Sequence, residues 1–207
     1  MSVRAVCLAL AGLFALSPCA QAQKDTSGAL AQVKSVLERA MEIQTRPDLE
    51  GDAHKKERAR LVRELISESF VTEDMARESV SDVWGKASAG QRSEYLRLFS
   101  VLFQDSYTRM VLNFLKKETI EYPGEPTAKG KGVLVQTVIM RANEHIPVNY
   151  SLTQRGGRWL IRDVEIDGIS IVENYKSSFS RVTRSSSFAG LVDRMRLQSK
   201  AISDDDR

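Results

Sequence analysis

The residues best spaced for catalysis are three carboxylates, Asp163, Glu165 and Asp167, which occupy alternate positions of one segment. Alternate positions of a strand share one face, so two of these groups could support general acid–base chemistry. The same spacing also fits a solvent-facing strand edge that ends in an Asp-Gly turn at Asp167-Gly168. Catalysis by Asp163 and Asp167 is therefore one hypothesis, and a structural role for both is the other.

The other residue types that carry chemistry form no recognisable site. The two histidines, His54 and His145, lie far apart in the sequence, and neither has a second His at the helical spacing of a metal site. The sequence also lacks a Gly-rich phosphate loop and a Gly-x-Ser-x-Gly nucleophile motif. We therefore expect no cofactor and no metal.

Charge and cysteine content narrow the function classes further. The 207 residues have a formal net charge of +3, and positive and negative side chains are interspersed without a Lys/Arg block. Nucleic-acid binding therefore receives little support. Both cysteines, Cys7 and Cys19, lie inside an N-terminal leader, so the mature chain is expected to fold without disulfides.

Residues 1–22 have the pattern of a secretory signal peptide. Arg4 supplies the positive charge, residues 6–16 form an apolar run too short to span a membrane, and residues 20–22 form a small-x-small cleavage site. Lipoprotein processing at Cys19 is an alternative that the preceding proline disfavours. Cleavage after Ala22 removes 22 of 207 residues and leaves 185, which suits one domain exported to the periplasm.

Helical spacing dominates the first half of the chain. Apolar residues recur at this spacing over residues 30–40, a charged surface helix is expected over 54–67, and a short helix over 72–84. Ser88 and Gln91 form a capping box that starts a long helix toward Lys117. Apolar residues cover more than one side of this helix, so it should lie in the core, or between core and a ligand.

The pattern then changes to the two-residue period of strands. Strands are expected over 119–122, 132–141, 146–153 and 159–166, and a hairpin turn over 155–158. Two closing helices are expected over 172–181 and 188–199. The fold class is therefore α+β, with a small curved antiparallel sheet of about four strands packed against several helices.

This organisation predicts one domain over residues 23–200 with a disordered tail over 201–207. The domain divides into a mainly helical part, an antiparallel sheet and closing helices, over 23–118, 119–167 and 168–200 respectively.

Residues in three regions resemble a known family. The first region combines a Trp-led strand, an Asp-Gly-x-Ser turn and an Asn-Tyr pair, at Trp159, Asp163, Val164, Asp167, Gly168, Ser170, Asn174, Tyr175 and Phe179. The second consists of Ser88, Gln91, Arg92, Phe99, Phe103 and Tyr107, and the third of Phe70, Met75 and Trp84. This set resembles the periplasmic phospholipid-binding component of the Mla lipid-transport system, also called the toluene-tolerance auxiliary family.

The resemblance implies a lipid carrier and not an enzyme. It implies a fold similar to nuclear-transport-factor-like cones, with an N-terminal helical part and an apolar cavity that holds phospholipid acyl chains. The implied partners are an outer-membrane lipoprotein–porin complex and an inner-membrane ABC transporter with an MCE lipid-shuttling ring. The chain itself is expected to be a monomer.

Twelve residues are expected to bind the lipid, although core packing is the alternative for each. They are Phe99, Phe103, Tyr107 and Met110 on the long helix, Val135, Ile139, Val148, Tyr150 and Trp159 on the sheet, and Ile169, Val172 and Tyr175 after the turn. Three cations near the closing helix are candidates for a phosphate contact, namely Lys176, Arg181 and Arg184.

The N-terminal third departs from the family pattern. Many relatives have a Leu-Pro-x-Phe-Asp step where residues 66–71 read ISESFV, without the Pro and the Asp. The cargo is therefore open between a glycerophospholipid, a hopanoid and another lipid. A periplasmic enzyme that uses Asp163 and Asp167 is one alternative, and an interaction module without a ligand is another.

Overall fold

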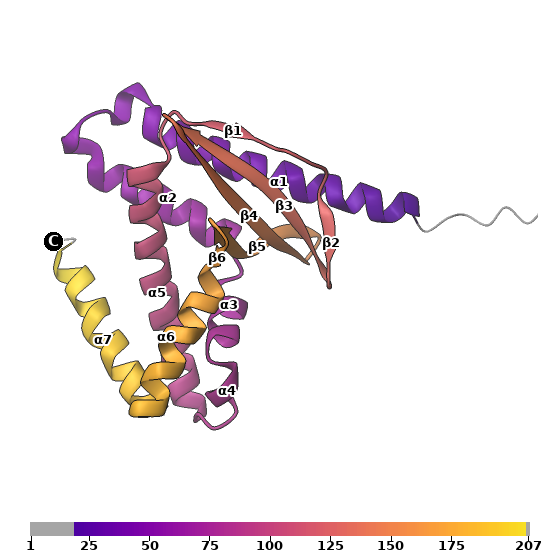
Figure 1. Cartoon of the computed structure of the whole chain (residues 1–207). Coiled ribbons are helices and arrows are strands. Elements are labelled where there is room, and N and C mark those ends of the chain that lie inside the picture. Colours follow the sequence, from indigo (N-terminus) through magenta and orange to yellow (C-terminus); the bar gives the residue numbers. More distant parts are fainter. Residues whose placement is uncertain (1–18, 206–207) are drawn as a thin grey trace, which may run out of the picture.

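The computed structural model describes residues 19–205, and Figure 1 shows their arrangement. The helices are α1 (Cys19–Thr45), α2 (Lys55–Ser69), α3 (Thr72–Ser79), α4 (Ser81–Trp84), α5 (Ala89–Phe114), α6 (Ile171–Ser185) and α7 (Phe188–Asp205). The strands are β1 (Thr119–Glu121), β2 (Thr127–Lys129), β3 (Gly132–Arg141), β4 (Glu144–Arg155), β5 (Arg158–Ile166) and β6 (Ile169–Ser170). Residues 1–18 of the expected signal peptide lie outside the described residues, so cleavage after Ala22 stays a prediction.

The strands form one antiparallel sheet in the order β1-β3-β4-β5-β6. The short strand β2 also pairs with β3, on the edge that β1 uses. Pro123 and Gly124 separate β1 from β2, because proline has no N–H to donate to the ladder. The α+β class is thereby confirmed. The sheet has six strands where about four were expected, because β2 and β6 are too short to leave a periodic pattern.

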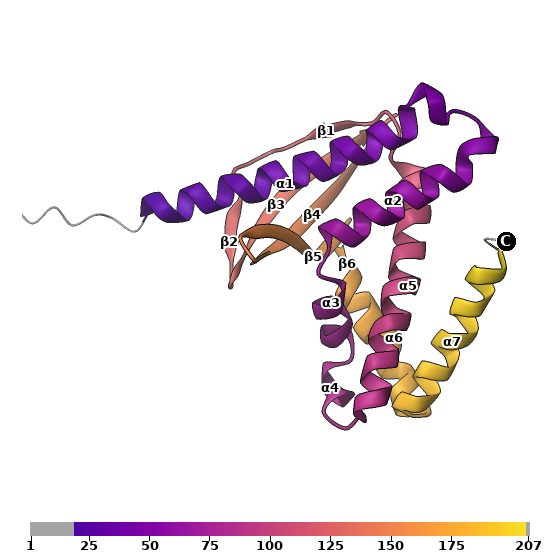
Figure 2. The same ribbon diagram turned by 180° about the vertical axis from the view of Figure 1, so that it is seen from behind.

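Helices α1 and α2 cover one face of the sheet, called here the inner face. Figure 2 shows α1 lying across the strands with α2 beside it. The inner face carries alternate residues of β3 and β4, among them the buried Val135, Val148 and Tyr150. A Cβ on Gly28 of α1 would lie 3.0 Å from Nε1 of Trp159, so this glycine allows α1 to approach the start of β5 closely.

Helix α5 connects the two ends of the molecule. It begins among α3, α4, α6 and α7 and ends near the strands (Figure 1). Its start is the expected capping box, in which Gln91 N donates to Ser88 Oγ at 3.2 Å and Ser88 N donates to Gln91 Oε1 at 2.9 Å. In the helical end, Tyr95 of α5 is fully buried and its hydroxyl lies 2.7 Å from Ser79 Oγ of α3.

Two helix ends differ from the sequence expectation. Helix α5 stops at Phe114, because Leu115 is extended (φ −122°, ψ 95°) and Gln44 of α1 donates to the carbonyl oxygens of Val111 and Leu115, at 2.8 and 2.6 Å. Helix α7 continues to Asp205, past residue 200, because Ile202 packs against the core and no Gly or Pro interrupts this segment. Within residues 19–205, no helix combines the length and apolarity that crossing a membrane requires.

Candidate functional site

An apolar cavity of about 250 Å³ lies between α1, α2, α5 and the inner face of the sheet. Its lining residues are apolar or aromatic except for Arg141. They are Val36, Leu37, Ala40, Val62, Leu65, Ile66, Phe70, Tyr107, Met110, Val111, Phe114, Leu115, Ile139, Arg141, Ile146, Val148, Tyr150 and Ile166. Such a lining can hold hydrocarbon, and among its residues only Arg141 carries a charge at neutral pH.

Helix α2 contributes to this cavity through a narrow stripe at helical spacing. Val62, Leu65 and Ile66 recur at i, i+3 and i+4 and are all buried. The opposite side of α2 is exposed, and there Arg60 pairs with Glu57 and with Glu64. The expected charged surface helix is therefore present, and its apolar stripe faces the cavity.

Two tyrosines, Tyr107 and Tyr150, line the cavity together with Phe70. The Tyr107 ring lies 5.0 Å from the Phe70 ring and 5.6 Å from the Phe103 ring, measured between centroids. Tyr150 projects from β4 and is 3% exposed. Burial raises the pKa of Tyr107 and of Tyr150 well above the ordinary value near 10, so both hydroxyls stay protonated at neutral pH.

Phe114 and Arg141 form the mouth of the cavity. Phe114, the last residue of α5, is 53% exposed, which is unusual for so large an apolar side chain. The guanidinium carbon of Arg141, at the end of β3, lies 5.2 Å from the centroid of the Phe114 ring. Gln44 fixes this end of α5 through its two hydrogen bonds, so the mouth has a defined position relative to α1.

Five of the twelve expected lipid-binding residues line the cavity. Tyr107 and Met110 do so from α5, and Ile139, Val148 and Tyr150 do so from the sheet. They come together because the second half of α5 faces the inner side of β3 and β4.

Four other expected residues belong to packing at or near the helical end. Phe99 and Phe103 stack at 6.0 Å between ring centroids, and the Tyr175 ring of α6 lies 5.1 Å from Phe99. Val172, near the start of α6, is 3% exposed. Phe99 lies outside the cavity lining because Tyr175 and Phe179 of α6 pack against it, and Phe103 packs against Phe70 and Phe99.

The last three expected residues lie at other places in the sheet. Val135 is 1% exposed and packs into the core, and Trp159 packs against Gly28 of α1. Ile169 is 65% exposed, because it lies in β6, the two-residue strand at the edge of the sheet. The cavity residues of α1 and α2 were not among those expected, although helical spacing was the available signal.

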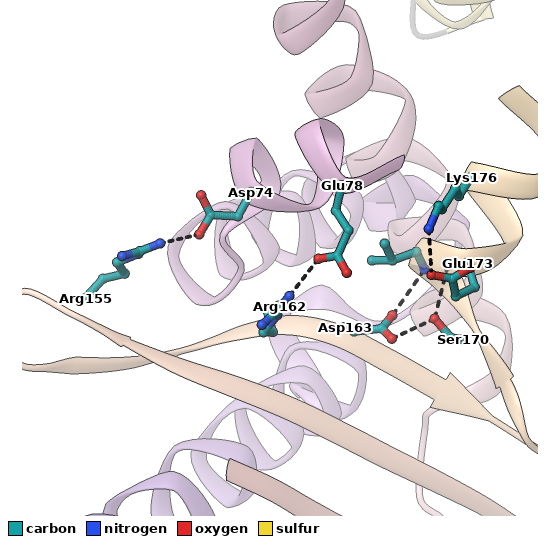
Figure 3. A network of polar contacts seen from close by, with 9 residues as sticks. Asp74, Glu78, Arg155, Arg162, Asp163, Ser170, Glu173 and Lys176 are labelled. Carbon is teal, nitrogen blue, oxygen red and sulfur yellow. Dashed lines mark hydrogen bonds and ion pairs between the residues drawn. The ribbon is translucent and has the colours of Figure 1, made fainter. Parts of the chain in front are cut away.

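Asp163 has a structural role, because both of its carboxylate oxygens accept hydrogen bonds from the start of α6. Figure 3 shows its carboxylate pointing toward the start of α6. Oδ2 accepts from Ser170 Oγ at 2.6 Å, and Oδ1 accepts from the backbone N of Val172 at 3.1 Å. Ser170 in turn caps α6 by accepting from Glu173 N at 3.1 Å. Asp163 therefore joins β5 to the start of α6.

The neighbouring charges in Figure 3 also make structural contacts. Arg155 pairs with Asp74 and Arg162 pairs with Glu78, both at 2.7 Å, which ties β4 and β5 to α3. Asp167 is exposed and has φ +50°, the left-handed conformation of an Asp-Gly turn. These positions match the structural hypothesis for the alternating carboxylates.

The described part of the chain contains no cluster of three or more His, Cys, Asp or Glu side chains suited to a metal ion. His54 and His145 are both exposed.

Comparison with protein-family models gives a match over most of the chain. The model described as MlaC protein matches residues 34–197. The chain belongs to the MlaC protein family. The match extends upstream of Phe70, where the resemblance in the sequence begins, and it includes the cavity-lining parts of α1 and α2.

A solved structure shares the fold. It is a phospholipid-binding protein from Ralstonia solanacearum in complex with a phospholipid, with a TM-score of 0.71 and 21% sequence identity. The similarity covers 84% of this chain and 98% of that chain. Comparison with curated proteins gives no match.

The residues that carry the MlaC resemblance mostly stabilise the fold. Trp159 packs on α1, Asp163 and Ser170 hold the start of α6, and Phe99 lies in the aromatic core. Phe70 and Tyr107 are exceptions, because they line the cavity. The MlaC motif therefore identifies the architecture around the cavity more than the cavity wall itself.

Proposed function

We propose that this protein is a lipid carrier that holds acyl chains in the cavity between α1, α2, α5 and the sheet. The observation that carries the proposal is the cavity itself, with its volume of about 250 Å³, its apolar lining and its mouth at Phe114 and Arg141. Membership of the MlaC family supports it, as does the fold shared with a protein solved with a phospholipid.

An apolar cavity of this kind makes lipid transfer feasible. Each CH₂ moved from water to an apolar site gains roughly 0.8 kcal/mol, so exposing two chains of about sixteen carbons costs on the order of 25 kcal/mol. A cavity wall as apolar as a membrane interior removes most of this cost. The free energies of the lipid in the membrane and in the cavity then become nearly equal, so the protein can both load and unload lipid.

The cavity volume limits what fits without rearrangement. Pockets for drug-sized ligands enclose roughly 300–1,000 Å³, and this cavity measures about 250 Å³. A two-chain phospholipid is larger than such ligands, so its chains enter completely only if the walls separate. We propose that α1 and α2 move away from α5 as lipid enters.

The location and the partners follow from the leader and the family. We infer that the signal peptide directs the chain to the periplasm, where residues 23–200 act as one domain. There the protein would shuttle lipid, as a monomer, between an outer-membrane lipoprotein–porin complex and an inner-membrane ABC transporter with an MCE ring. Binding is favoured over catalysis because the oxygens of Asp163 are both engaged in the fold.

A vesicle transfer assay tests this function. The purified mature protein should speed the movement of a fluorescent phospholipid from donor to acceptor vesicles, in proportion to protein concentration. Transfer no faster than in buffer, by protein with a native circular dichroism spectrum, would contradict the proposal.

A further inference from the structure

A polar pocket of about 480 Å³ adjoins the mouth of the apolar cavity. Its lining comes from the end of α1 and the segment after it, from the loop after α5, and from the β3–β4 turn. Arg141 lines both spaces. An apolar space and a polar space that share one arginine have the shape of a site for an amphiphile, with its tail inside and its headgroup outside.

The polar pocket has an excess of positive charge. It is lined by four cations, Arg46, Lys116, Lys117 and Arg141, and by two carboxylates, Glu50 and Glu118. Asp48 neutralises Arg46 through two hydrogen bonds, at 3.0 and 2.5 Å. Lys116 and Lys117 are exposed, and within the described side chains neither forms an ion pair.

Arg141 is placed to contact a ligand that extends from the apolar cavity into the polar pocket. Its guanidinium stacks near the exposed Phe114 ring, at 5.2 Å from the centroid. Its Nε is 4.0 Å from Glu118 Oε1, which is the outer limit of an ion pair. Glu118 Oε2 accepts a hydrogen bond from the backbone N of Lys116, and at 4.0 Å Oε1 is too far from Arg141 Nε for a hydrogen bond. The guanidinium group of Arg141 therefore has N–H donors available for an anion at the mouth of the cavity.

We propose that the polar pocket binds the phosphate of a lipid headgroup, with Arg141 as the contacting residue and Lys117 as a supporting charge. Guanidinium and phosphate form paired charge-assisted hydrogen bonds, which an uncharged headgroup cannot make. The protein would therefore prefer a phosphate-bearing lipid over diacylglycerol with the same chains. This inference rests on the proposed lipid-carrier function and adds the recognition of the headgroup.

The cations of α6 are less suitable for this role. Lys176 pairs with Glu173 at 3.6 Å, and Arg181 lines neither the cavity nor the polar pocket. Arg181→Gln is thus a matched control, because it removes the same charge from an exposed site outside both spaces.

The test measures which lipid the protein takes up. The purified mature protein is incubated with phosphatidylcholine vesicles that contain equal small fractions of phosphatidic acid and diacylglycerol, and the lipids bound to it are quantified by mass spectrometry. We expect Arg141→Gln to lower the phosphatidic acid to diacylglycerol ratio by about tenfold, the low end for a charge-assisted contact. The low end applies because the Arg141 side chain is 41% exposed.

Arg141→Lys should have a phosphatidic acid to diacylglycerol ratio between those of Arg141→Gln and the wild type. Lys117→Gln should lower this ratio less than Arg141→Gln does. An unchanged ratio in Arg141→Gln, or an equal loss in Arg181→Gln, would overturn the inference. Binding of inorganic phosphate alone, abolished in Arg141→Gln without any change in the lipid ratio, would also overturn it, because the pocket would then serve free anions. A wild-type protein that takes up no lipid would instead contradict the carrier function itself.

Discussion

Filling the cavity from one strand position should abolish lipid binding without unfolding the protein. Ile139 lies on the inner face of β3 and lines the cavity, and its neighbour Val138 lies on the opposite face. Ile139→Trp therefore places an indole in the space proposed for the acyl chains. Val138→Trp makes the same kind of change one residue away, outside the cavity lining.

The expected loss of affinity follows from the atoms displaced. Tryptophan has about six more side-chain heavy atoms than isoleucine, so it excludes about six CH₂ groups at roughly 0.8 kcal/mol each. The loss is then up to about 5 kcal/mol, or on the order of 10³-fold in affinity. The indole fits because the cavity provides about 250 Å³ of space. Stability should therefore change little in Ile139→Trp.

The assay counts bound phospholipid per protein molecule after purification without detergent. Thermal unfolding followed by circular dichroism shows whether each variant is folded. Ile139→Trp should carry little or no lipid, and Val138→Trp should carry as much as the wild type. Val135→Trp should instead destabilise the protein by roughly 1–3 kcal/mol, because Val135 is 1% exposed and outside the cavity lining.

Equal lipid content in folded Ile139→Trp and Val138→Trp would refute this reasoning, because the chains would then lie elsewhere. A loss of lipid in Val138→Trp alone would place the site on the outer face of the sheet.

Three further predictions concern the fold. Asp163→Ala should lower the free energy of unfolding by about 2–3 kcal/mol in urea denaturation, because it leaves Ser170 and the α6 start without their acceptor; an unchanged midpoint would show that this contact is dispensable. Gly132→Ala should destabilise by at least about 2 kcal/mol, because its Cβ would lie 2.1 Å from the carbonyl oxygen of Leu152; a wild-type melting temperature would contradict this. Burial raises the pKa values of Tyr107 and Tyr150, so both stay protonated in the folded state above pH 10, where the tyrosines of the unfolded state ionise. The free energy of unfolding is therefore unaffected by these tyrosines below pH 10 and falls as the pH rises above 10. The slope should reach about 1.4 kcal/mol per pH unit for each tyrosine, and Tyr150→Phe should flatten it; equal slopes in both proteins would exclude Tyr150 as a source.

Local signals in the sequence predicted much of the fold, because their physics acts over a few residues. The Ser88–Gln91 capping box marks the start of α5, and the glycine pair at residues 156–157 marks the β4–β5 turn. The two-residue period marks β3, β4 and β5. Strand pairing over longer distances left no such signal, as in the hydrogen bond from Val71 N to the Ile161 carbonyl.

The cavity wall was harder to predict, because it depends on what covers each turn of a helix. Phe99, Phe103 and Tyr107 follow one another at four-residue spacing on α5, yet only Tyr107 lines the cavity. The difference arises because Phe99 packs against Tyr175 of α6 and Phe103 packs against Phe70 and Phe99, and α6 lies about seventy residues after Phe99 in the chain. Packing of this kind is a tertiary property that periodicity alone does not encode.

Native mass spectrometry of the mature protein, purified from the periplasm in detergent-free buffer, tests the central claim most directly. We predict an adduct with the mass of one phospholipid, which organic solvent releases and lipid analysis then identifies. A hopanoid adduct would keep the carrier function and change its cargo. A protein that carries no lipid, and takes none up from phospholipid vesicles, would contradict the account.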